Sequence, residues 1–187
     1  MTTISSARVV RDLAKNRNLI LDAGCGSGVL ALHLAKQNPY STVHGYDISP
    51  DQIAKAEGYK KGHGIGNASF SVSGHDDFQP PYAMDMVCTI GSLVDESEIP
   101  YYEAHDQLGP AKDIVRRRLS RFSHMLNSSG IYVFSWASLP EDTETFVELA
   151  GNCGLNFKEE FHMDIPSELK TYYHPEAMKF VLVFQRS

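Results

Sequence analysis

Short apolar runs alternate along the chain with segments in which apolar residues recur at helical spacing. The first run lies in "NLILD" (residues 18–22) and is typical of a short strand that is buried on both faces. A later helix is predicted to begin with Ser49 as its N-cap and Pro50 at its first position. The whole pattern predicts strands at 18–22, 41–47, 67–73, 83–90, 130–136, 156–163 and 178–184. It predicts helices at 5–16, at 29–36, from 49 onward, at about 110–126 and at 141–151.

This alternation of strands and helices is typical of an α/β protein with a central, mostly parallel sheet. The sequence shows no internal repeat, low-complexity tract or linker, so we expect residues 1–187 to form one domain. Residues 1–17 would be a short N-terminal helical extension. No helical pattern separates the last two predicted strands, so a parallel crossover need not join them.

Three glycines at alternate positions follow the first predicted strand in "LDAGCGSG" (residues 21–28). Ligands of open α/β sheets bind at the carboxyl ends of the strands, and glycine lets a ligand approach the backbone. Gly24, Gly26 and Gly28 therefore predict a bound cofactor. A P-loop would need Lys and then Ser or Thr after its last glycine, and a dinucleotide loop would need its last glycine where the chain has Val29.

The GxGxG spacing, preceded by Asp22, resembles motif I of the class I S-adenosylmethionine-dependent methyltransferases. Asp47, at the end of the second predicted strand, matches the acidic residue that holds both ribose hydroxyls in that family. A carboxylate suits this role because it accepts two charge-assisted hydrogen bonds at once. The resemblance extends along nearly the whole chain. It implies a doubly wound, mostly parallel seven-stranded sheet with an antiparallel C-terminal strand, which is the Rossmann-like methyltransferase fold.

The same resemblance assigns residues to an S-adenosylmethionine site. Asp22 would orient the methionine moiety, and the glycine loop would let that moiety approach. The segment "SGHDDF" (residues 73–78) matches the adenine-binding segment, but Gly74 or His75 stands where the family commonly has Asp. We expect Asp76 to bind the adenine amino group, with His75 as the second choice. The complete expected set is Asp22, Gly24, Cys25, Gly26, Gly28, Asp47, Ile48, His75, Asp76, Asp77 and Ile90.

Two tyrosine pairs, each close to a histidine, are the candidates for an acceptor pocket. They lie in "IPYYEAHD" (residues 99–106) and "LKTYYHPE" (residues 169–176), within segments that form the substrate pocket in the family. His105 is the best candidate for a catalytic base, because an unperturbed imidazole titrates near neutral pH. Alternatively, these aromatic residues pack the loops onto the sheet edge or form a dimer contact. The candidates are Tyr101, Tyr102, His105, Tyr172, Tyr173 and His174.

The charge and the cysteine content disfavour several kinds of ligand and partner. The formal net charge of −6 disfavours a broad nucleic-acid surface, because phosphate binding needs an excess of Lys and Arg. A cluster formed by Arg116, Arg117, Arg118 and Arg121 accompanies an apolar helical stripe, which predicts a solvent-facing helix surface. The three cysteines are far apart and no metal-ligand spacing occurs, so we expect neither disulfides nor a metal. We see no signal peptide or membrane-spanning run and expect a cytoplasmic protein without a membrane partner.

We therefore predict a methyltransferase that uses S-adenosylmethionine on an O, N or C nucleophile, with a small-molecule acceptor preferred over RNA or protein. One alternative is a non-catalytic S-adenosylmethionine-binding subunit whose partner completes the site. Only about 18 residues precede the first strand, and many family members close a longer extension over the cofactor. A second copy of the chain, in a homodimer, would supply such a lid. The other alternative is a nicotinamide-dependent dehydrogenase, in which Asp47 would bind a nicotinamide ribose.

Overall fold

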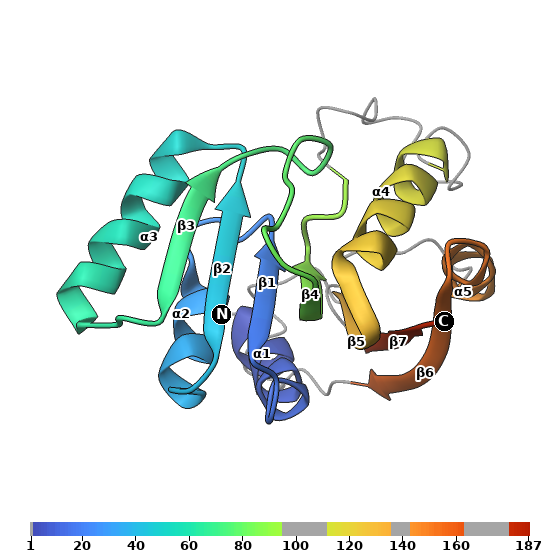
Figure 1. The fold of residues 1–187 in the computed structure, drawn as a ribbon, viewed down its shortest axis with the longest axis horizontal. Coiled ribbons are helices and arrows are strands. Elements are labelled where there is room, and N and C mark those ends of the chain that lie inside the picture. The colour runs from blue at the N-terminus through green and yellow to red at the C-terminus, as the bar shows by residue number, and fades with distance from the viewer. Residues whose placement is uncertain (1, 95–111, 136–142, 163–179) are drawn as a thin grey trace, which may run out of the picture.

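Seven strands form one sheet that is covered by helices on both faces (Figure 1). The computed structural model describes residues 2–94, 112–135, 143–162 and 180–187. The strands are β1 (Leu19–Ala23), β2 (Thr42–Asp47), β3 (Ala68–Val72), β4 (Met84–Ile90), β5 (Leu126–Ser135), β6 (Leu155–His162) and β7 (Phe180–Arg186). The helices are α1 (Thr2–Leu13), α2 (Val29–Gln37), α3 (Pro50–His63), α4 (Lys112–Met125) and α5 (Thr143–Asn152).

The strand order is β3-β2-β1-β4-β5-β7-β6, which runs from left to right in Figure 1. β1 pairs in parallel with β2 and with β4, and the parallel ladder continues outward to β3 and β5. β7 lies between β5 and β6 and is antiparallel to both. The predicted α/β fold with an antiparallel C-terminal strand is therefore confirmed. No crossover helix is needed between β6 and β7, because antiparallel neighbours can be joined by a loop.

The central strands divide their side chains between two cores, because successive residues of a strand point to opposite faces. Ile20 of β1 packs in a core with apolar residues of α1 and α2. Leu21, the next residue, packs in a second core with apolar residues of α4 and α5. Both side chains are fully buried. This two-sided burial accounts for the unbroken apolar run that marks β1 in the sequence.

The observed elements differ from the predicted ones mainly at their ends. β5 begins at Leu126, directly after Met125 ends α4, whereas the sequence pattern predicted a strand only from residue 130. Leu126 is fully buried and pairs with Met84, and the register between the two strands shifts before the next pair at Met86. The polar residues that follow Leu126 hide this extension in the sequence. The register shift lets the strand continue through them.

Candidate active site

A pocket of about 580 Å³ opens at the carboxyl ends of β1, β2, β3 and β4. The order of the strands reverses here, because β1 lies between β2 and β4. Ligands of doubly wound sheets bind at such a reversal of strand order. The pocket is lined by Gly24, Tyr46, Asp47, Ile48, Ser73, Gly74, His75, Asp76, Asp77, Ile90, Gly91, Ser92, Val94 and Arg118. Six of the predicted cofactor residues other than glycines are therefore brought together on its wall: Asp47, Ile48, His75, Asp76, Asp77 and Ile90.

The glycine loop turns sharply from β1 into α2 and is anchored to β2. The backbone N–H groups of Gly24 and Cys25 both donate to the carbonyl oxygen of Tyr46, each at 2.9 Å. Gly24 has a φ of +73°, and a Cβ on it would lie only 2.4 Å from the Cβ of Ser92. A side chain at Gly24 would therefore strain the backbone and collide with the pocket wall.

Asp47 ties the glycine loop to the start of α3. Its Oδ2 accepts a hydrogen bond from the backbone N–H of Gly26 at 2.8 Å, and its Oδ1 accepts one from Ser49 at 2.9 Å. A carboxylate offers about four acceptor positions, so each oxygen retains capacity after these two bonds. Asp47 is partly exposed and lines the pocket. Ile48, the next residue, leaves 70% of its surface exposed on the same wall.

Asp22 lies beneath the glycine loop and is almost completely buried, with 2% of its surface exposed. Its Oδ1 lies 3.9 Å from the Sγ of Cys88, while its Oδ2 has no hydrogen-bond partner among the described residues. Burial raises the pKa of Asp22 to about 7, because an apolar environment disfavours the charged carboxylate. A buried carboxyl oxygen without a partner is costly and therefore marks a position from which a ligand or water can be bound.

The side chain of Cys25 packs against β2 and is not among the residues that line the pocket. Its Sγ lies 2.9 Å from the position that a Cβ on Gly45 would occupy, so the thiol packs against β2. Burial raises the pKa of the Cys25 thiol well above its ordinary value. The thiol is therefore protonated at neutral pH, and only the backbone of this residue is placed to contribute to the loop.

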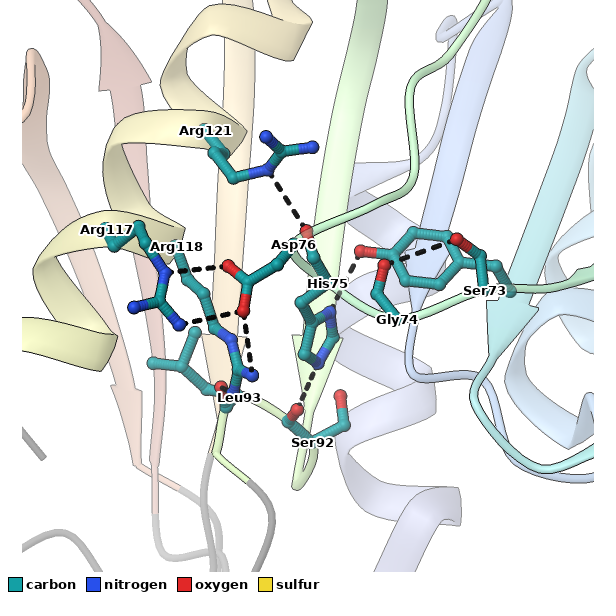
Figure 2. A network of polar contacts seen from close by, with 10 residues as sticks. Ser73, Gly74, His75, Asp76, Ser92, Leu93, Arg117, Arg118 and Arg121 are labelled. Carbon is teal, nitrogen blue, oxygen red and sulfur yellow. Dashed lines mark hydrogen bonds and ion pairs between the residues drawn. The ribbon is translucent and has the colours of Figure 1, made fainter. Parts of the chain in front are cut away.

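His75 connects the ends of three strands (Figure 2). Its Nε2 lies 2.5 Å from the carbonyl oxygen of Ser92, and its Nδ1 lies 2.9 Å from the hydroxyl of Tyr46. Because a carbonyl can only accept, Nε2 donates; in the neutral ring, Nδ1 then accepts from the Tyr46 hydroxyl. Ser92 in turn donates its hydroxyl to the carbonyl of Ala23 at 2.6 Å. This chain of bonds holds the end of β2, the segment after β3, the segment after β4 and the end of β1 together beneath the pocket.

Asp76 is bound by arginines of α4. Its two carboxylate oxygens accept from Nε and Nη2 of Arg117, each at 2.8 Å, in a bidentate pair. Nη2 of Arg118 lies 3.6 Å from the same Oδ2. The hydrogen bonds from Arg117 hold the pKa of the Asp76 carboxyl below its usual value. Asp77, by contrast, is exposed, and its backbone N–H donates to the carbonyl of Gly74.

The expectation of a solvent-facing arginine surface holds for Arg116 and Arg117, which are exposed, whereas Arg121 is partly buried and Arg118 is buried. Arg116 does pair with Asp113 at the surface. Arg117 binds Asp76 while its side chain stays exposed. Arg118 is 5% exposed and donates to the carbonyl of Leu93 at 2.7 Å. Arg121 donates to the carbonyls of His75 and Phe78, at 3.1 and 3.0 Å. Long arginine side chains can bury their stems while their guanidinium groups reach neighbouring loops, which an apolar stripe alone does not reveal.

Sequence reasoning missed several pocket residues. Tyr46, Ser92 and Arg118 line the pocket but belong to no expected site. Tyr46 directly precedes Asp47, and Ser92 follows β4, so their positions at strand ends were the available signal. No signal in the sequence pointed to Arg118, because this residue lies within α4 and reaches the pocket only through the packing of that helix.

The predicted acceptor residues lie outside the described residues. They are Tyr101, Tyr102, His105, Tyr172, Tyr173 and His174. Within the described ranges, no group of three or more His, Cys, Asp or Glu side chains is gathered to hold a metal ion. No helix in those ranges is long and apolar enough to cross a membrane.

Comparison with known proteins places this fold and loop geometry in a family. Residues 15–167 match the family described as "Methyltransferase domain". The chain is 27% identical, over 125 residues, to the 2-heptyl-1-hydroxyquinolin-4(1H)-one methyltransferase of Mycobacteroides abscessus. That alignment covers 67% of this chain and 50% of the relative, so the chain spans about half the length of that relative.

Two solved structures show the same fold at low sequence identity. The magnesium protoporphyrin IX methyltransferase of Synechocystis PCC 6803, with bound S-adenosylmethionine, has a TM-score of 0.72 and 18% identity, covering 97% of this chain and 78% of that one. The N-methyltransferase NodS of Bradyrhizobium japonicum, with bound S-adenosylhomocysteine, has a TM-score of 0.68 and 17% identity. The match covers 97% of this chain and 84% of NodS. The family match, the sheet order and the glycine loop agree, and the chain belongs to the class I S-adenosylmethionine-dependent methyltransferase family.

Proposed function

We propose that the pocket binds S-adenosylmethionine and that the protein transfers its methyl group to a small-molecule acceptor. The observation that carries this proposal is the position of Asp47. Its carboxylate binds the backbone N–H of Gly26 at 2.8 Å and lines the pocket, so the acidic end of β2 and the glycine loop form one binding surface. A nucleoside with a free 2′,3′-diol fits this surface, because two hydroxyls can donate to the remaining acceptor positions of the carboxylate.

The chain's other residues fit the rest of the cofactor. Ile48 is exposed on one wall and Ile90 lines the pocket as well, so both can pack against the adenine ring. The unpartnered Oδ2 of Asp22 lies beneath the loop and suits the ammonium of the methionine moiety, either directly or through a water. Gly26 leaves open space where a side chain would stand, since nothing lies within 4 Å of a Cβ built on it.

For the adenine amino group, we now favour Asp77 over Asp76. Both carboxylate oxygens of Asp76 accept from Arg117, and both ring nitrogens of His75 are used by Tyr46 and Ser92. Asp77 is exposed and lines the pocket, and within the described residues no hydrogen bond engages its carboxylate. It is therefore the acidic group of this segment that is best able to accept from a ligand.

The chemistry depends mainly on positioning. S-adenosylmethionine, when bound, supplies a methyl group that is already activated by its positive sulfonium. The protein's own task is to orient the two reactants and to exclude water. The hydrogen-bond chain from Tyr46 through His75 and Ser92 to Ala23 supports this task, because it fixes the strand ends on which the pocket is built.

A small-molecule acceptor is supported by the relatives, whose names give a hydroxyquinolone and magnesium protoporphyrin IX as the molecules they methylate. The net charge of −6 also disfavours a nucleic-acid acceptor. The roles of Tyr101, Tyr102, His105, Tyr172 and Tyr173, the homodimer and the cytoplasmic location stay predictions.

Isothermal titration of the purified protein with three ligands tests the cofactor assignment. We expect S-adenosylmethionine and S-adenosylhomocysteine each to bind at one site per chain, and we expect NAD not to bind. Binding of NAD alone, or of none of the three, would overturn the proposal. Tight binding of S-adenosylmethionine without methylation of any small acceptor until a second protein is added would instead support the non-catalytic subunit.

A further inference from the structure

We propose that Asp22 is protonated in the ligand-free protein and releases its proton when the cofactor binds, so that cofactor affinity depends on pH. This inference rests on the proposed function and adds the regulation of its binding site. Asp22 lies in β1, where its neighbours in the sheet are Gly45 of β2 and Cys88 of β4. The glycine loop begins two residues later, at Gly24. The Asp22 carboxyl therefore lies next to the loop that would bind the methionine moiety.

The side chains around Asp22 offer it no cation. The Sγ of Cys88 lies 3.9 Å from its Oδ1. Toward β2, Gly45 has no side chain, and the Sγ of Cys25 lies 2.9 Å from the position that a Cβ on Gly45 would occupy. Burial raises the pKa of both thiols well above the ordinary value, so both are neutral. Among the residues that the structure describes, no Lys, Arg or His side chain is paired with Asp22.

These surroundings favour the neutral form of the Asp22 carboxyl. The residue is 2% exposed, and a charged carboxylate is strongly disfavoured where neither water nor a cation reaches it. Burial is the largest influence on the pKa of Asp22 and raises it to about 7. The backbone N–H of Ala31, in the first turn of α2, and the Cys88 thiol act against this rise, whereas the Asp47 carboxylate adds to it. The ligand-free protein therefore keeps the proton at mildly acidic pH.

The ammonium group of the cofactor supplies the missing cation. A positive charge near a carboxyl favours its ionised form and so lowers the pKa of Asp22. Charges act over several ångströms in a buried site, so this holds also when a water molecule lies between the two groups. The O–H bond of Asp22 then breaks and its proton passes to the solvent, which leaves a carboxylate beside an ammonium. Because binding releases a proton, the affinity rises with pH until the ligand-free carboxyl is itself ionised.

Two ligands separate this effect from the other titratable groups of the pocket. Asp47 and His75 line the pocket on the side where the adenosine would bind. 5′-Methylthioadenosine has the adenine, the ribose and the thioether of S-adenosylhomocysteine but lacks its amino-acid group. A proton that is released with S-adenosylhomocysteine and not with 5′-methylthioadenosine therefore comes from the methionine end of the site.

Calorimetric titration in two buffers of different ionisation enthalpy counts the protons that are released on binding. At pH 6 we expect about 0.5–1 proton per S-adenosylhomocysteine and less than about 0.2 per 5′-methylthioadenosine. From pH 5.5 to pH 7.5, the affinity for S-adenosylhomocysteine should rise at least about fivefold relative to that for 5′-methylthioadenosine. Asp22→Asn should abolish both differences between the ligands. Asp51→Asn should keep them, because Asp51 is an exposed acid in the first turn of α3.

Three results would overturn the proposal. The first is a wild-type protein that binds S-adenosylhomocysteine at pH 6 without releasing a proton. The second is an equal release with 5′-methylthioadenosine, which would assign the proton to a group on the adenosine side. The third is an Asp22→Asn variant that still releases the proton. Failure of the proposed function is seen separately, because the wild-type protein would then not bind S-adenosylhomocysteine.

A second measurement needs no variant and covers the case in which Asp22→Asn does not fold or does not bind. In ¹³C NMR spectra of the wild-type protein at pH 6, the carboxyl carbon of Asp22 should have the chemical shift of a protonated acid. S-adenosylhomocysteine should move this signal to the position of a carboxylate, and 5′-methylthioadenosine should not. A carboxyl that is already ionised before the ligand is added, or one that S-adenosylhomocysteine leaves protonated, would contradict the proposal.

Discussion

The aromatic ring of Phe70 packs directly against Gly28, the last glycine of the cofactor loop. A Cβ built on Gly28 would lie 2.9 Å from two carbons of that ring and 2.8 Å from the Cβ of Ala56. Gly28 also has a φ of +76°, which side chains rarely tolerate. Packing and backbone conformation therefore both require glycine at this position.

Replacing this glycine should destabilise the protein more than replacing a glycine in open space. We expect Gly28→Ala to lower the free energy of unfolding in urea by about 1–3 kcal/mol, from backbone strain and overpacking. Gly58→Ala is the control, because Gly58 lies inside α3 with nothing within 4 Å of its Cβ position. There, alanine should raise the free energy of unfolding by about 0.5–1 kcal/mol through its higher helix propensity. Equal effects at the two positions would contradict this account.

Removal of the Asp47 carboxylate should weaken cofactor binding. We expect Asp47→Ala to lower the affinity for S-adenosylmethionine at least tenfold, or by about 1.4 kcal/mol, because the acceptors for the ribose hydroxyls are lost. Asp51→Ala is the matched control, since Asp51 is an exposed acid in the first turn of α3. Calorimetry at a temperature where circular dichroism shows all variants folded gives the comparison. An Asp47→Ala protein that binds as well as the wild type would disprove the ribose assignment.

Asp22 should make stability fall as pH rises. Its folded-state pKa of about 7 exceeds that of an ordinary aspartate, so between roughly pH 4 and 7 the unfolded chain loses a proton that the folded ligand-free protein keeps. The contribution of protonated Asp22 to the free energy of unfolding is complete below the pKa of Asp22 in the unfolded chain. It is lost as the pH rises through the pKa of Asp22 in the folded protein. Asp22→Asn lacks this dependence. The difference in unfolding free energy between variant and wild type should therefore shift in favour of the variant from pH 5 to pH 8, by about 1–3 kcal/mol.

Urea unfolding of the wild-type and Asp22→Asn proteins at both pH values measures this shift, and other titrating groups cancel in the difference. A difference that is the same at pH 5 and pH 8 would mean that Asp22 titrates normally in the folded protein.

Arg121 should stabilise the segment that follows β3. Arg121→Ala would leave the carbonyls of His75 and Phe78 without their donor, and we expect a loss of about 1–3 kcal/mol in unfolding free energy. Arg116→Ala removes an exposed pair with Asp113 and should cost less than about 1 kcal/mol. Hydrogen exchange provides a local measurement, because the amide of Phe78 donates to Gly74 within this segment. Its exchange should accelerate in Arg121→Ala and stay unchanged in Arg116→Ala.

The fold was largely predictable because its information is local. Each of three features can be recognised from a few consecutive residues: the apolar run of β1, the N-cap formed by Ser49 and the glycine loop. The structure contains all three. The start of β5 was not predictable in this way. Leu126 joins the sheet through burial and pairing with Met84, which are long-range effects that no window of sequence contains.

The candidate site was predictable to the extent that it lies on strand ends. The positions of Asp47, Ile48 and Asp77 follow from the order of the strands and the lengths of the loops. The arginines of α4 could not be assigned, because their direction depends on how that helix packs beside β4 and β5. The pairing of Asp76 with Arg117, which changes the expected adenine contact, is a consequence of the same packing.

The insertion of β7 between β5 and β6 determines the order in which the sheet can be completed. β1 to β5 can assemble as a parallel unit while the chain is still being synthesised, but β6 has β7 as its neighbour in the sheet. A chain in which β7 has not yet docked presents the free edge of β5 and an unpaired β6 to other chains, and such edges promote aggregation. The docking of β7 should therefore be the step after which the folding chain no longer exposes strand edges in this half of the sheet.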